Sequence, residues 1–172
     1  MIGLASGRAS FRLFLAAFRR YGNRRKYLGR ARSMRNGIFW IVSVLALLWS
    51  LTGLYDLYMT LTLNQDYLAQ FPPQMLSMIE AFPEWRRLLW TTSVFLGVIA
   101  AALLLLRRVM AERAFWATAV MMAIGFLGYD LPFADGITAY GTFGVVFSLI
   151  LIAIQILLAL YARWAARHGL LK

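Results

Sequence analysis

Four charged side chains lie at the ends of long apolar stretches of the sequence. Two are aspartates, which close the first and third stretches, and two are adjacent arginines, which precede the second. Charges at neighbouring helix ends can pair, and aromatic rings favour the same interfacial zone of a membrane. The pattern predicts a structural ion-pair and aromatic clasp formed by Asp56, Arg86, Arg87, Asp130, Tyr55, Tyr58 and Trp85. Two alternatives stay open: a shallow site for a polar small molecule or ion, and loop charges that face water.

Few other side chains could support catalysis. The single histidine, His168, follows the last apolar stretch, and the sequence has no cysteine. Without thiols there are no disulfides, thiolate metal ligands or cysteine nucleophiles. The sequence also lacks metal-ligand spacings, nucleotide-binding loops and nucleophile elbows. We therefore expect no enzyme, no catalytic residues, no bound metal and no cofactor.

Gln155 is the one strongly polar residue deep inside the fourth apolar stretch. In lipid, such an amide is expected to hydrogen-bond a neighbouring helix or its own backbone. The alternative is a role in transport, although a pathway for a charged substrate should need more polar groups within the membrane.

The composition is that of a membrane protein. Hydrophobic residues make up 62% of the 172 and charged residues 15%, whereas about 25% of the residues of a soluble domain are charged. A bilayer core about 30 Å thick is crossed by roughly 20 apolar residues of helix. Four stretches meet this requirement, at about residues 38–59, 88–106, 112–131 and 140–163. We predict an all-α integral membrane fold, a four-transmembrane-helix bundle over residues 37–165.

A short helix is predicted between the first two spans. Pro72 and Pro73 can begin it, and Pro83 can follow its end. We expect this helix to lie on the membrane surface, with Glu80 and Glu84 toward water. Its apolar face, toward the membrane, is formed by Met75, Leu76, Ile79 and Phe82.

The first 36 residues carry ten of the eighteen Lys and Arg residues and no acidic residue. Phenylalanines recur there at helical spacing beside arginines, as in an amphipathic basic helix at a headgroup region. We expect this arm to bind anionic lipid headgroups or to dock on a partner protein through Arg8, Phe11, Arg12, Phe14, Phe18, Arg19, Arg24, Arg25 and Lys26. Positive charges beside membrane spans set the orientation of the protein and attract anionic lipid headgroups. The net charge of +11 therefore does not indicate nucleic-acid binding.

The positive residues are divided unequally between the two sides of the predicted membrane. Sixteen of the eighteen lie in the N-terminal arm, in the turn at 107–113 or after residue 162, and only Arg86 and Arg87 lie on the other side. Lys and Arg near span ends stay cytoplasmic. The arm and the basic tail, residues 166–172, are therefore both predicted to be cytoplasmic.

Three segments carry a resemblance to a known family: residues 49–60, 67–73 and 82–85. They resemble small bacterial membrane proteins with four helices that are often labelled sugar transporters. The first span of that family follows W-N-x-x-G-x-x-D-Y-x-M-T, and this chain matches it at Trp49, Gly53, Asp56, Met59 and Thr60. Ser50 replaces the asparagine and Leu57 the tyrosine. The resemblance covers about residues 38–165, without the basic arm, and implies four spans in a bacterial inner membrane.

The function expected from these patterns is non-catalytic. Small residues recur four apart in two spans, at Gly97 and Ala101 and at Gly144 and Ser148, and they allow helices to approach closely in lipid. We expect an accessory or assembly subunit that packs against a larger membrane protein complex. The alternative is a transporter of a small solute or lipid that acts as an oligomer.

Overall fold

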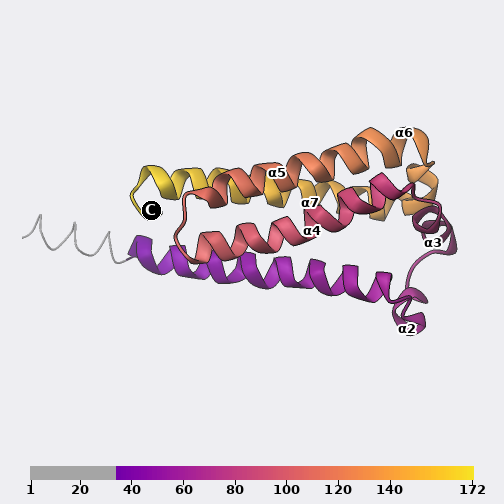
Figure 1. Ribbon diagram of the computed structural model, residues 1–172, viewed down its shortest axis with the longest axis horizontal. Helices are drawn as coiled ribbons and strands as arrows, with labels where there is room; N and C mark the ends of the chain where they lie inside the picture. The colour runs from indigo at the N-terminus through magenta and orange to yellow at the C-terminus, as the bar shows by residue number, and fades with distance from the viewer. Residues whose placement is uncertain (1–33) are drawn as a thin grey trace, which may run out of the picture. The chain divides into compact units, whose positions relative to one another are not determined.

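A computed structural model describes residues 34–172, which are helical apart from short connections and contain no strand (Figure 1). The predicted basic arm lies outside the described residues, except for residues 34–36. Its amphipathic helix and its candidate docking residues, from Arg8 to Lys26, therefore stay predictions. The chain divides into two units, residues 1–40 and 41–172. The contacts among helices α3 to α7 all lie within the second unit.

Four helices are long and apolar enough to cross a membrane: Met34–Leu61, Glu84–Leu105 (α4), Met110–Phe133 and Gly136–Arg167 (α7). The third combines α5 (Met110–Gly125), the π-helix η1 (Phe126–Asp130) and α6 (Leu131–Phe133). The four predicted spans are confirmed as helices. Most of their ends lie two to four residues beyond the predicted bounds, because polar and charged residues at the ends continue the helices.

Two short helices connect the first and second spans: α2 (Gln65–Leu68) and α3 (Pro73–Glu80). The side chain of Asn64 caps α2 by accepting a hydrogen bond from the backbone N–H of Tyr67. Proline occupies the first position of α3, where its missing N–H costs no helical bond. The short helix predicted from the prolines is confirmed, but its most buried residue is Met78, which the predicted apolar face does not include.

Small side chains fill the interfaces between the long helices. Helix α4 packs on α5, and α5 packs on α7. Gly97, Ala100 and Ala101 are buried on α4, and Ala159, Ala162 and Ala165 are buried on α7. In the first long helix, Ser43, Ala46, Ser50 and Leu57 are buried. The predicted packing residues Gly97 and Ala101 lie in an interface, whereas Gly144 and Ser148 are only partly covered.

The second unit has two distinct ends. Figure 1 shows α3 and α6 at one end, with the start of α4 and of α7; we call it the clasp end. The opposite end holds the α4–α5 connection and the C-terminal residues; we call it the turn end.

Candidate functional site

A buried ion pair joins two helices at the clasp end. Arg86, in the first turn of α4, donates from Nε to Asp130 Oδ1 at 2.8 Å and from Nη2 to Asp130 Oδ2 at 2.5 Å. The side chains are 8% and 1% exposed. Parallel hydrogen bonds of this kind match the planar guanidinium to the carboxylate and are roughly twice as strong as neutral ones.

Two aromatic residues complete this cluster. The hydroxyl of Tyr140 donates to Asp130 Oδ2 at 3.0 Å, so the carboxylate accepts three hydrogen bonds. The guanidinium of Arg86 also lies over the ring of Phe82, 4.7 Å from its centroid. Buried charges are tolerated where such partners replace water. Each charge of the pair is therefore neutralised and held inside the protein.

The π-helix η1 places Asp130 in this cluster. The N–H of Leu131 bonds to the carbonyl of Phe126, five residues earlier, in place of the usual four. The extra residue rotates the later part of the helix by about 100° relative to a continuous α-helix. Phe126 and Asp130, at the two ends of η1, are both buried.

Two glycines make room for the ion pair. A Cβ on Gly125 would lie 2.8 Å from Arg86 Cζ and 3.1 Å from Arg86 Nε. A Cβ on Gly136 would lie 2.5 Å from the carbonyl oxygen of Asp130. Real Cβ atoms essentially never lie within 3.0 Å of another atom. The backbone at Gly125 therefore supports the guanidinium directly, and the backbone at Gly136 packs on that of Asp130.

A kink in α7 directs Tyr140 toward the ion pair. Gly141 has φ of 61° and ψ of 175°, which interrupts the helix immediately after Tyr140. This region of backbone conformation is open essentially only to glycine. The first turn of α7 is thus set off from the rest, and the Tyr140 ring lies 5.6 Å from that of Phe126.

Helix α3 covers the cluster from one side. Met78, Phe82 and Ala139 form a small buried core, with Tyr129 and Tyr140 among the side chains packed against it. This helix, which is predicted to lie on the membrane surface, packs through Met78 on α7. Its exposed Glu80 agrees with the prediction.

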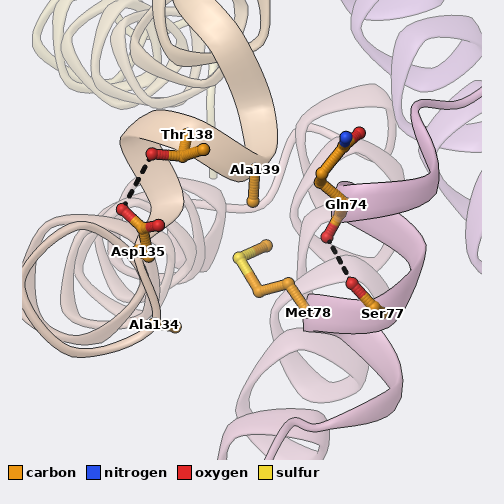
Figure 2. Close-up of a pocket in the computed structure, with 7 residues that line it drawn as sticks. All are labelled: Gln74, Ser77, Met78, Ala134, Asp135, Thr138 and Ala139. Atoms are coloured by element: carbon orange, nitrogen blue, oxygen red, sulfur yellow. Dashed lines mark hydrogen bonds between the residues drawn. The ribbon is translucent and has the colours of Figure 1, made fainter.

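A pocket lies between α3 and the first turn of α7 (Figure 2). Its volume is about 270 Å³, and it is lined by Gln74, Ser77, Met78, Ala134, Asp135, Thr138 and Ala139. The Met78 side chain reaches into it, and Thr138 Oγ1 donates to Asp135 Oδ1 at 3.0 Å (Figure 2). Two of its apolar lining residues, Met78 and Ala139, belong to the small core against which Tyr140 packs.

Asp56 has a different partner from the one predicted. It accepts a 2.5 Å hydrogen bond from the hydroxyl of Tyr67, in α2, and it makes no ion pair with an arginine in the described part of the chain. The Tyr67 ring lies 6.0 Å from Tyr55 and 5.2 Å from Phe71. Burial raises the pKa of Tyr67 above its ordinary value, and the hydrogen bond to Asp56 raises it further. This contact holds α2 against the end of the first long helix.

The remaining predicted clasp residues lie at the surface. Arg87 and Tyr58 are exposed, and Trp85 is half exposed with its ring 5.0 Å from that of Tyr129. Of the seven predicted residues, the structure therefore brings together Arg86 and Asp130 as an ion pair. Sequence reasoning missed Tyr140, Phe82, Gly125 and Tyr67. The short Pro132–Gly136 connection was the available signal for Tyr140, because it returns the chain to Asp130 within ten residues.

Gln155 lies at a meeting point of three helices. A Cβ on Gly97 of α4 would lie 3.6 Å from Thr118 Cγ2, in α5, and 3.9 Å from Gln155 Nε2. Gln155 is 7% exposed, and its Oε1 has no hydrogen-bond partner among the described residues. The predicted interhelical hydrogen bond is therefore not formed through this oxygen.

In both aspartate sites, the carboxylate accepts hydrogen bonds from other side chains. Asp130 is held by three donors, and Asp56 by one. Among residues 34–172, no group of three or more His, Asp or Glu side chains lies close enough together to hold a metal ion. Comparison of the chain with protein families, with curated proteins and with solved structures found no match.

Proposed function

We propose that this chain is a non-catalytic membrane subunit that packs against another membrane protein through the clasp-end half of α7. This proposal depends on a long stretch of that helix that contains no buried residue. No residue from 141 to 151 is buried, whereas Ile152, Gln155, Ala159, Ala162 and Ala165 follow at regular spacing toward the turn end. Within the described residues, the outer part of α7 is therefore only partly covered, and most of its side chains are exposed.

The character of this stretch favours a helix as its partner. Phe143 and Phe147 are exposed, with nearly parallel rings 6.2 Å apart. Gly144 and Ser148 lie close to them in sequence and allow a second helix to approach closely. The buried Arg86–Asp130–Tyr140 cluster anchors the first turn of α7, directly before this stretch.

The test is gentle solubilisation from native membranes, followed by native-gel mass spectrometry. We expect the wild type to migrate with a larger protein, and Ser148→Trp to lose that association. Ala153→Trp is the matched control, since Ala153 is an exposed small residue of the same helix. A wild-type monomer or small homo-oligomer would contradict the proposal. The same gel without residues 1–36 measures the contribution of the basic arm.

We propose a bacterial inner membrane, with both termini cytoplasmic, as the location. The family resemblance supports the membrane, and the charge distribution supports the orientation. Within residues 41–172, six of the eight Lys and Arg side chains belong to the turn end. Reporter fusions at Lys172 and at Asn64 should report opposite sides, and the same side for both would contradict this topology.

The transporter alternative depends on Gln155. Its unpartnered oxygen is the observation in favour, but the pocket between α3 and α7 does not include it. Substrate-dependent stabilisation that is lost in Gln155→Leu would favour transport over the subunit role.

A further inference from the structure

The C-terminal residues join the α4–α5 connection at the turn end. The N–H of Val109 donates to the carbonyl of Lys172 at 3.1 Å, and the N–H of Lys172 donates to the carbonyl of Arg107 at 2.6 Å. Leu170 and Leu171 are buried beside this contact. Gly169 has φ of 68°, which turns the chain back after α7. Two segments some sixty residues apart in sequence therefore form one surface.

This surface has a large excess of positive charge. It carries one acidic side chain, Glu112, and six basic ones: Arg107, Arg108, Arg113, Arg163, Arg167 and Lys172. The single ion pair described there, between Arg163 Nε and Glu112 Oε1, is 4.0 Å long and solvent-accessible. Exposed pairs of this kind contribute little. All six cations except Arg107 are exposed.

Large apolar side chains border the cations. Leu106 is 68% exposed, Met110 52% and Val109 48%. Trp164 is 38% exposed and its ring lies 4.5 Å from that of His168. Tryptophan at the boundary of a span favours the headgroup level of a bilayer. A soluble anion would use the cations alone, whereas a lipid would contact both the cations and the apolar border.

We propose that the surface formed by residues 106–113 and 163–172 binds the phosphate headgroup of an anionic phospholipid. Arg108, Arg167 and Lys172 attract the phosphate, and the acyl chains lie along Leu106, Val109 and Met110. The backbone contact between Lys172 and the α4–α5 connection assembles the site, because it brings the tail cation to the cations of the turn.

The test is photo-crosslinking of the full chain, reconstituted in phosphatidylcholine, with a phosphatidylglycerol that carries a photoreactive acyl chain. Labelled peptides are mapped by mass spectrometry, which separates this surface from the basic residues 1–36. We expect label on residues 106–110 and around Trp164. At subsaturating probe, Arg108→Gln should reduce that label about fivefold, the effect of one cation at an anionic membrane surface. Arg87→Gln is the matched control, an exposed arginine at the clasp end, and should change nothing.

A second variant tests the assembly without any change of charge. Leu170→Ser/Leu171→Ser removes the buried anchor of the tail, and it should reduce the label at residues 106–110. Its melting temperature in zwitterionic detergent shows whether the bundle stays folded, and Arg108→Gln carries the test if it does not. Equal label in wild type and Arg108→Gln would overturn the proposal. Competition by inorganic phosphate as effective as that of unlabelled phosphatidylglycerol would also overturn it, since the site would then take free phosphate.

Discussion

The guanidinium of Arg86 in α4 and the carboxylate of Asp130 in η1 form a bidentate ion pair between residues 44 positions apart. Arg86 begins the second span and Asp130 ends the helical backbone of the third before α6. At the opposite end, Arg107 and Val109 of the short α4–α5 connection are both hydrogen-bonded to the backbone of Lys172. The α4–α5 hairpin is therefore fixed at both ends, and we expect the ion pair to determine the register of the two helices.

Removing Arg86 should destabilise the protein strongly. In Arg86→Met, the Asp130 carboxylate stays buried and loses its only cationic partner. The expected loss is about 3–5 kcal/mol of unfolding free energy, as for other buried pairs broken on one side. Chemical unfolding in detergent, followed by circular dichroism, measures it. Arg87→Met is the matched control, and its unfolding should match that of the wild type because Arg87 is exposed.

Replacing both partners should cost less than replacing one. The double variant Arg86→Met/Asp130→Leu leaves no unpaired buried charge, so it should recover part of the stability lost in Arg86→Met. Tyr140 then loses its acceptor, which limits the recovery. Additive losses in the double-variant cycle would show that the two side chains are not coupled.

Gly125→Ala should destabilise the protein, although alanine is the better helix former. The new methyl would lie 2.8 Å from Arg86 Cζ and would push the guanidinium away from Asp130. Overpacking of this kind costs about 1–3 kcal/mol. Gly128→Ala, three residues later, is the control, because no atom lies within 4 Å of its Cβ position. Similar melting temperatures for the two variants would place the guanidinium elsewhere.

Gly141→Ala isolates the effect of backbone conformation. No atom lies within 4 Å of the position of its Cβ, yet φ is 61°. The strain should cost about 1–3 kcal/mol and draw Tyr140 away from Asp130. Gly53→Ala, in the helical interior of the first span and equally uncrowded, should instead stabilise by about 0.5–1 kcal/mol. Paired thermal melts of the two variants give the contrast.

Tyr67 should make stability depend on alkaline pH. Burial and the Asp56 hydrogen bond raise its pKa in the folded protein, so folding favours the protonated phenol. Its contribution is full below the ordinary tyrosine pKa of about 10 and is lost as pH rises through the folded value. The melting temperature should therefore fall above about pH 10, and less steeply in Tyr67→Phe. Asp56→Ala should lower the melting temperature at pH 7, and no change would mean that this contact does not hold α2.

The spans were predictable because a membrane imposes a length and an apolar composition on any helix that crosses it. The prolines around residue 73 likewise restrict where a helix can begin. The π-turn at Phe126 and the kink at Gly141 were not predictable, because no residue pattern in the third span separates a π-turn from an α-turn. A glycine within an apolar stretch can indicate either close helix packing or a positive φ, so the sequence did not show which of the two applies at Gly141.

The clasp residues were predictable only in part, for a related reason. Apolar stretches that end at one side of a membrane bring their terminal charges to one level, which identified Arg86 and Asp130. Helix rotation decides which charge faces the bundle, and one residue changes it by about 100°. Arg87 thus faces outward beside a buried Arg86. Asp56 instead accepts a hydrogen bond from a tyrosine hydroxyl of α2. That helix has only four residues, too few for a pattern of apolar residues to predict it.

Gln155→Leu should be neutral or stabilising. The wild-type amide is buried with an oxygen that has no hydrogen-bond partner in the described part of the chain, and an unmade hydrogen bond costs about 1–3 kcal/mol. Leucine has a similar size and places no polar side-chain atom beside Gly97 and Thr118. Gln155→Glu is the contrast, because it places a carboxyl group at the same point and should destabilise. Thermal unfolding in detergent ranks the three proteins. A loss of stability in Gln155→Leu comparable to that in Gln155→Glu would mean that the oxygen binds an ordered water or ligand.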